Sequence, residues 1–576
     1  MKKFWAVVVC IGLTIPGLST QSQADTVIDE QALIPPPPVA DISNTVGWTG
    51  AYADDSQRID SQSFLAESTA AWTGDDALCS SLEDSKCAGK STVFYNAFLP
   101  PCGSTTDTNC IDAINAILKD GSVSSGSFQQ YFPVRDKAAY SGDPSKGLPS
   151  GWYPSIWSFS GVEHQGGNQF LAAIQVSSGG WPLIKDMKKS NLLTESLFPI
   201  SIEPKTDFGD TFSEASITTL TSGLHRLQIG GVTDRTCPLY LGDHQCAVQW
   251  PFPQNVRYQI KVRISFAMNG WFNGRTGNPD VQVTKVGAEG QTLSITASPL
   301  KVPILSVWKK YVDLPPQLQA YLKTQTTSGA IYAPLNWQTI WDHQTTPPWE
   351  KMSILRSFFN YDSQEFNEFS LWLQASENRS YVDKTEWQVK SVASGPYNSC
   401  FAGVDGVAGT VSSNATMYIA SPPTFDSTTQ TLDYKVAAPH YDRLGNVNVG
   451  SYDLVINSAT ARCLYGFTSA PLKAAVSVVS NDGQTQVATN SLSEKDGWLH
   501  LSVQGFNYSS PTLKVKFTQD GEVARPKQAS PIAKVQPPKS ISTITCINVQ
   551  THALKTFPST PAGCPNHYKL VPTKKK

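Results

Sequence analysis

The alternation of apolar and polar residues between positions 256 and 266 predicts one strand of a β-rich chain. Apolar side chains occupy every second position, and the positions between them carry mainly Arg, Gln and Lys. Because successive side chains of a strand point to opposite faces, this alternation indicates a half-buried strand. Turns are expected at Asn269-Gly270 and at Gly274, and further strands at residues 281–286 and 292–297.

Short strand patterns recur at regular intervals toward the C-terminus. They cover residues 431–437, 451–456, 475–479, 484–488, 498–503 and 513–517. Asn481-Asp482-Gly483, between the third and the fourth of them, is a strong β-hairpin signal. Regular strand spacing of this kind predicts a β-sandwich.

Helical patterns concentrate between residues 306 and 379. Helices are expected at residues 317–323, 349–358 and 363–375. Asp362 with Glu365 forms a capping-box pattern at the start of the third helix. A weaker helical pattern lies at residues 111–118.

These patterns predict a mainly β fold, in which two β-sandwich-like units are joined by a helical segment and followed by a small disulfide-closed module. The predicted parts are a signal peptide (1–24), a Pro-rich spacer (25–45), an N-terminal β-rich domain with Cys-stapled loops (46–305), a mixed or helical connecting segment (306–379), a C-terminal β-sandwich-like domain (380–519), a Pro/Lys linker (520–541) and a basic disulfide module (542–576).

The N-terminal residues have the three parts of a secretory signal. Lys2 and Lys3 precede an apolar run, and Ser22-Gln23-Ala24 offers small residues where a signal peptidase cleaves. The alternative is a membrane anchor, but the run is shorter than the roughly 20 apolar residues that a span needs. We therefore expect cleavage after Ala24, a secreted or cell-envelope location, and no transmembrane segment in the mature chain.

Ten cysteines remain after residue 24, and they form neighbouring couples. An even number at short spacings behind an export signal is typical of a disulfide framework. The predicted pairs are Cys79 with Cys87, Cys102 with Cys110, Cys237 with Cys246, Cys400 with Cys463, and Cys546 with Cys564.

The net charge of −2 hides an uneven distribution. Residues 523–576 hold nine Lys or Arg and no Asp or Glu. Removing these nine cations together with Lys2 and Lys3 leaves −13 on residues 25–522. An acidic body argues against nucleic-acid binding. The basic tail either holds an anionic surface such as a cell-wall polymer or is a solvated linker.

No residue pattern identifies a catalytic centre, a metal site or a cofactor. Two residue pairs come nearest to an acid–base pair: Glu163 with His164, and His440 with Asp442. We expect both pairs to have a structural role in turns. His244 beside Asp243, inside a predicted disulfide loop, is a conceivable metal ligand, although oxidised cysteines would not join it. The carboxylate pairs Asp54-Asp55 and Asp75-Asp76 are adjacent in sequence, which does not place them across a sugar.

Three tryptophans are the candidate binding residues. Exposed aromatic rings can stack on sugar faces, whereas most large aromatic side chains belong to the core. Trp271 is the first candidate, because a turn between Gly270 and Gly274 would leave its ring partly exposed. Trp152 and Trp157 are the others.

Three stretches resemble uncharacterised secreted or cell-envelope proteins of actinobacteria. They are Gly270-Trp271-Phe272-Asn273-Gly274-Arg275, the segment from Tyr434 to Leu499 that contains Ala461-Arg462-Cys463-Leu464-Tyr465-Gly466-Phe467, and the tail from Ile544-Thr545-Cys546 through Gly563-Cys564-Pro565 to the terminal lysines. At Asn566-His567 the chain departs from the tail pattern. The resemblance implies export and placement at the cell envelope, and it carries no activity.

The sequence thus favours an exported, disulfide-stabilised protein with a non-enzymatic structural or binding role, whose partner is a cell-wall or extracellular polysaccharide. The alternative is a secreted hydrolase acting on polysaccharide or peptide, with its site in residues 46–305.

Overall fold

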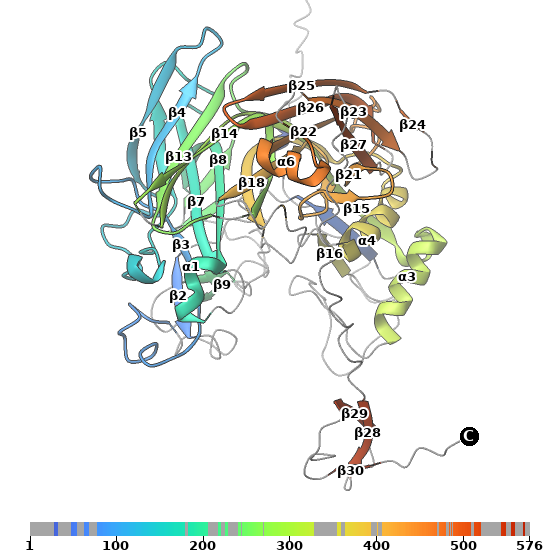
Figure 1. The fold of residues 1–576 in the computed structure, drawn as a ribbon, viewed down its shortest axis with the longest axis horizontal. Coiled ribbons are helices and arrows are strands. Elements are labelled where there is room, and N and C mark those ends of the chain that lie inside the picture. Colours follow the sequence, from blue (N-terminus) through green and yellow to red (C-terminus); the bar gives the residue numbers. More distant parts are fainter. Residues whose placement is uncertain are drawn as a thin grey trace, which may run out of the picture. The chain divides into compact units, whose positions relative to one another are not determined.

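The computed structural model is mainly β, as the sequence predicts (Figure 1). It describes residues 28–32, 48–54, 63–67, 78–178, 183–204, 217–219, 225–227, 240–242, 245–268, 270–287, 289–327, 354–358, 363–392, 400, 406–468, 472–479, 483, 485–486, 488–508, 512–519, 543–548, 554–558 and 568–570. The chain forms two compact units. One holds Met1–Tyr465 with Ala470–Asp520, and the other holds Gly466–Ser469 with Gly521–Lys576.

A closed circuit of paired strands is the centre of the larger unit. Each strand pairs with the next, and the last pairs with the first. The circuit runs through β4 (Cys110–Ile117), β5 (Val123–Tyr131), β6 (Ser155–Phe159), β7 (Gln169–Ser178), β8 (Asn191–Pro204), β17 (Val382–Val392), β14 (Gly270–Val286), β15 (Gly290–Lys310) and β13 (Arg257–Ile264). The circuit closes on itself, and among the described residues the stretch 280–286 of β14 pairs with β15 alone.

Further strands extend the circuit. β7 pairs with β3 (Val93–Phe98), which pairs with β2 (Phe64–Glu67). β8 pairs with β12 (Gln245–Gln249), and β12 pairs with β11 (Tyr240–Gly242). β14 continues through β18 (Val407–Ser413), β22 (Val449–Asn457), β26 (Trp498–Asn507) and β25 (Thr489–Lys495). β15 pairs with β1 (Trp48–Ala53), which pairs in parallel with β16 (Ile354–Phe358).

A separate six-stranded sheet lies against β22. The Tyr434 and Tyr452 rings join the two sheets, with their centroids 5.6 Å apart. The strands of the six-stranded sheet are β19 (Met417–Tyr418), β20 (Thr424–Asp426), β21 (Thr431–Ala437), β23 (Leu472–Val479), β24 (Thr485–Gln486) and β27 (Thr512–Gln519). β9 (Ile217–Thr219) and β10 (His225–Leu227) form a two-stranded sheet elsewhere. In the smaller unit, β28 (Thr543–Asn548) pairs with β29 (Leu554–Pro558) and β30 (Tyr568–Leu570).

Helices are few in the described part of the chain. α3 (Pro316–Thr327) and α4 (Ser363–Ala375) confirm two predicted helices. α1 (Met187–Ser190) and α6 (Ser458–Tyr465) were not predicted. The helices predicted at residues 111–118 and 349–358 are wrong where the structure describes them, because these residues form β4 and β16.

The expected division into two β units does not match the strand pairings. The boundary after residue 305 falls inside β15, which continues to Lys310. β17 begins the predicted C-terminal domain, yet it pairs with β8, β14 and β15 of the circuit. Hydrogen bonds therefore cross both of the predicted boundaries.

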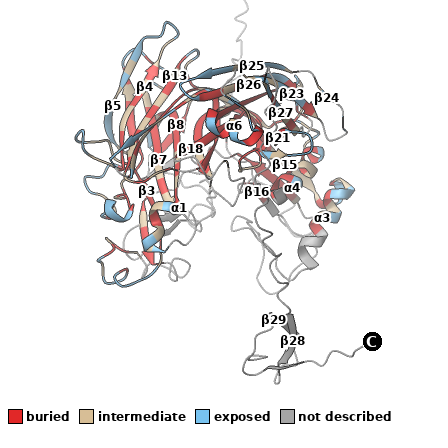
Figure 2. Ribbon diagram, viewed as in Figure 1, coloured by how far each residue is buried: buried red, intermediate tan, exposed pale blue. Residues whose placement is uncertain are grey.

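The principal apolar core draws buried residues from strands around the circuit, and Figure 2 shows red along β7, β8 and β13. β13 alternates between half-buried and buried positions, as its sequence predicts. Glu195 of β8 is an exception within this core. Its neighbours across the strands, Ile174 and Val389, and its own-strand neighbours Leu193 and Leu197 all belong to the apolar core. The Glu195 carboxyl is fully buried and has no hydrogen-bond partner among the described residues.

Candidate functional site

The disulfide framework is confirmed for three of the five predicted pairs. Cα atoms are 6.0 Å apart in Cys79–Cys87, 5.0 Å in Cys102–Cys110 and 5.7 Å in Cys400–Cys463. Cys246 is also disulfide-bonded, but its expected partner lies outside the described residues. The predicted Cys546–Cys564 pair is likewise untested, because Cys564, like Cys237, lies outside the described residues.

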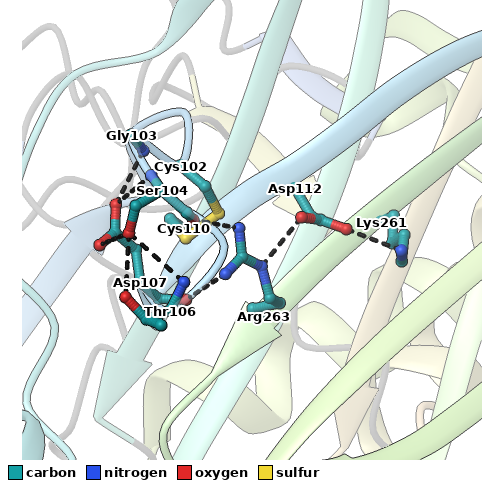
Figure 3. A network of polar contacts seen from close by, with 9 residues as sticks. All are labelled: Cys102, Gly103, Ser104, Thr106, Asp107, Cys110, Asp112, Lys261 and Arg263. Atoms are coloured by element: carbon teal, nitrogen blue, oxygen red, sulfur yellow. Dashed lines mark hydrogen bonds and ion pairs between the residues drawn. A yellow bond between two sulfur atoms is a disulfide. The ribbon is translucent and has the colours of Figure 1, made fainter.

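The loop closed by Cys102–Cys110 holds a polar network, and its groups satisfy one another (Figure 3). Asp107 accepts hydrogen bonds from the Gly103 and Ser104 amides and from the Ser104 hydroxyl, and these bonds lower the pKa of Asp107. Arg263 donates to the main-chain carbonyls of Ser104 and Asp107 at 2.7 and 2.8 Å. The network therefore fixes the shape of the loop rather than presenting a free reactive group.

Asp112 links this loop to β13. It accepts from Arg263 Nε at 2.9 Å and pairs with Lys261 Nζ at 2.7 Å. Burial alone would raise the pKa of Asp112, but the two cations lower it. Asp112 is thus ionised at neutral pH, and its charge is compensated.

Both histidine–carboxylate candidates have structural roles. The His164 Nδ1 atom accepts from the Gly166 amide at 3.1 Å, and Nε2 lies 2.9 Å from the Gln169 carbonyl oxygen. Burial lowers the pKa of His164, so the ring is neutral. The His440 ring contacts the Tyr508 carbonyl, at 2.6 Å. Asp442 instead accepts from three groups of its own turn.

The carboxylate candidates do not form a catalytic pair among the described residues. The Asp54 side chain is fully buried, and its Oδ2 atom lies 2.7 Å from Lys384 Nζ and 2.8 Å from the Tyr52 hydroxyl. Asp55, Asp75, Asp76, Asp243 and His244 lie outside the described residues. In the part of the chain that the structure describes, no group of three or more His, Cys, Asp and Glu is placed to hold a metal ion.

Trp271 is buried, and the expectation of a partly exposed ring is wrong. Gly270–Val286 is one strand rather than a turn at Gly274, and Trp271 is 1 % exposed. The indole packs on Gly409 of β18, where an added Cβ would lie 2.5 Å from the ring. Its surroundings assign Trp271 to the core.

The other two candidate tryptophans meet in one group of rings with Phe128 and Tyr131, which we call the aromatic cluster. Tyr131 stacks on Trp152, with centroids 4.9 Å apart and an interplanar angle of 22°. Phe128 meets Tyr131 edge-on at 5.1 Å and Trp157 at 5.9 Å. Ring separations in this range are favourable for aromatic pairs.

A β-bulge brings these rings to one face. Phe128 pairs with Trp157 and Tyr131 pairs with Ser155, while the register shifts between Phe128 and Gln130. Two residues three positions apart in a regular strand would point to opposite faces. The extra residue, Gln129, restores the alternation, so that Phe128 and Tyr131 share a face.

The rings differ in their exposure. Trp157 is 5 % exposed, and its indole nitrogen donates to the Ser155 hydroxyl at 2.8 Å, so it is the buried base of the cluster. Phe128 is 38 % exposed, and Tyr131 and Trp152 are half-buried. Burial raises the pKa of Tyr131 to about 12, so its hydroxyl remains a hydrogen-bond donor at neutral pH. Three rings are therefore accessible at the surface.

The glutamines of this stretch lie on the other face of the strand. Gln130 pairs with Ile156, and Gln129 Nε2 donates to the Ser158 hydroxyl, while Ile156 and Ser158 both alternate with Trp157 along β6. The polar group beside the rings is therefore the Tyr131 hydroxyl. Flat apolar rings with a hydroxyl at their edge can hold a molecule with one apolar face and a hydroxyl rim.

Phe128 and Tyr131 were not among the sequence-derived candidates, and only an anticipated bulge would have placed them together.

No helix of the described residues has the length and apolar character needed to cross a membrane. Comparisons of the chain with family models, curated proteins and solved structures give no match. Functional inference therefore depends on the geometry of this site.

Proposed function

We propose that the protein is an exported, non-enzymatic binding protein of the cell envelope or extracellular space, and that its aromatic cluster holds a saccharide. The observation that carries the proposal is the set of accessible rings of Phe128, Tyr131 and Trp152 on one face. A pyranose ring has an apolar face that stacks on such rings, and the Tyr131 hydroxyl can form hydrogen bonds with its hydroxyls.

A rigid support favours binding without a lid or an induced fit. The cluster stands on β5 and β6, which belong to the closed circuit, and Trp157 anchors it in the core. Rings that are ordered before binding lose little conformational entropy when a ligand arrives. The disulfides support the oxidising location, because such bonds persist outside the cytosol.

The test is glycan binding by the full chain and by the double variant Phe128→Ala/Tyr131→Ala, measured on a panel of neutral oligosaccharides and polysaccharides. Aromatic contacts are worth roughly 0.5–1.5 kcal/mol each, so we expect about 5- to 150-fold weaker binding for the double variant. Tyr441→Ala is the matched control, because Tyr441 is 36 % exposed and lies outside the cluster.

Equal binding by the double variant and the control contradicts the proposal, as does absence of binding to every neutral glycan. Circular dichroism of each variant separates lost binding from lost folding. Turnover of any glycan or peptide in the panel would instead support the hydrolase alternative.

Cell fractionation of the full chain and of a chain lacking residues 523–576 tests whether the basic tail retains the protein at the cell surface, since equal release of both contradicts retention.

A further inference from the structure

A pocket of about 990 Å³ lies beside α1, and four lysines line it. They come from two neighbouring segments. Lys146 ends the 3-10 helix η4 (Pro144–Lys146), whereas Lys185 belongs to η5 (Ile184–Asp186) and Lys188 and Lys189 to α1. The acidic residues of the lining are Asp186 and Glu289, so cations outnumber anions by two.

Two of the four lysines have no ion-pair partner among the described residues. Lys146 pairs with Asp143 at 3.0 Å, and Lys188 pairs with Glu289. Within the same part of the chain, neither Lys185 nor Lys189 forms a salt bridge, and both are exposed. With Asp186 counted against these two lysines, the pocket keeps a net charge of +1 beyond its two ion pairs.

The walls of the pocket are fixed to the core. Met187 of α1 is fully buried in the principal core. The Asn191 side chain donates to the Gly147 carbonyl at 2.7 Å, and the Ile184 amide donates to the Ser91 carbonyl at 2.9 Å. Gly147 closes η4 with φ +79° and approaches the Lys188 stem so closely that a Cβ there would lie 2.5 Å from Lys188 Cγ. The lysine backbones are therefore held in place before any ligand arrives.

We propose that this lysine pocket binds the phosphate group of a small organic phosphate or of a phosphate-bearing polymer. Every cation in the lining is Lys, a compact point charge that is common in phosphate sites. Leu183, which is 40 % exposed, and Phe266 add an apolar wall. The volume exceeds the need of a bare ion and falls within the range of small-molecule pockets. The pocket therefore has room for an organic body attached to the phosphate, and the comparison with a polycarboxylate tests the choice of phosphate.

Titration calorimetry on the full chain tests this inference with inorganic phosphate, glycerol 3-phosphate, poly(glycerol phosphate), an oligogalacturonate and a neutral oligosaccharide. We expect binding of glycerol 3-phosphate and of its polymer, with an affinity that falls as salt is added. Lys185→Gln/Lys189→Gln should weaken this binding about 2- to 30-fold, because both lysines outside the ion pairs are removed. Lys119→Gln/Lys137→Gln is the matched control, since these exposed lysines lie outside the pocket and lose the same charge.

Three outcomes would overturn the inference: no binding of any organic phosphate, equal loss in the control, or oligogalacturonate binding as tight as that of the phosphate polymer. Stronger binding of the polymer than of glycerol 3-phosphate identifies a polymer ligand, and equal binding identifies the small phosphate. The inference is independent of the aromatic cluster. Phe128→Ala/Tyr131→Ala should leave phosphate binding unchanged, and the lysine variant should leave neutral-glycan binding unchanged.

Discussion

Replacing Glu195 by Gln should make the protein more stable at high pH and should change little at low pH. The Glu195 carboxyl is fully buried among apolar neighbours, and this burial raises its pKa to about 8. The folded state thus favours the protonated carboxyl. Its contribution to stability is fully present below the unfolded pKa near 4.5 and is lost as the pH rises toward 8.

The size of the effect follows from that window. A group that is protonated in the folded state and ionised in the unfolded state changes the free energy of unfolding by about 1.4 kcal/mol per pH unit. Between pH 4.5 and pH 8 the upper limit is therefore about 5 kcal/mol. Local relaxation around a buried charge reduces this figure, so we expect Glu195→Gln to exceed the wild type by at least about 2 kcal/mol at pH 8.5.

The assay is guanidinium denaturation followed by tryptophan fluorescence at several pH values from 4.5 to 9. The quantity of interest is the difference between variant and wild type at each pH, because the other titrating groups cancel in it. Glu203→Gln is the control, since Glu203 lies on the same strand and is exposed. A difference for Glu195→Gln that stays constant across the pH range would refute the reasoning.

Three other substitutions probe the packing described above. Lys384→Met removes the ammonium group 2.7 Å from the buried Asp54 carboxylate and should cost about 3–5 kcal/mol in the free energy of unfolding, measured by chemical denaturation. Gly409→Ala places a Cβ against the Trp271 indole and should cost about 1–3 kcal/mol in the same measurement, with a change in tryptophan fluorescence. Arg263→Ala removes the donor to two loop carbonyls and should speed amide hydrogen exchange in residues 103–109, whereas unchanged exchange would contradict the role of Arg263.

The local sequence predicted the elements in which apolar side chains recur at one constant spacing from end to end. Residues 256–266 alternate without interruption, and β13 is half-buried as expected. The helix at residues 363–375 matches its predicted bounds, and Phe366, Phe369 and Leu373 of its apolar pattern are buried. Asp362 of the predicted capping box lies outside the described residues, and Glu365 pairs with Arg356. Neither case required knowledge of a distant partner.

Two β-bulges explain where the same reasoning failed. Ile111 and Ile114 are three positions apart and both buried, which resembles a helix in the sequence. In the structure they share one face of β4 because Asp112 is the extra residue of a bulge opposite the junction of Lys261 and Val262. The bulge in β5 has the same effect on Phe128 and Tyr131 of the aromatic cluster. A bulge depends on the partner strand, which the local sequence does not specify.

The strand circuit is completed by a segment that is made late. β17, at residues 382–392, fills the place between β8 and β14, and nearly four hundred residues precede its end. A nascent chain that ends before β17 exposes two long strands with unpaired amides and carbonyls. Folding of this protein therefore requires that its first three hundred residues be kept from aggregating until β17 follows.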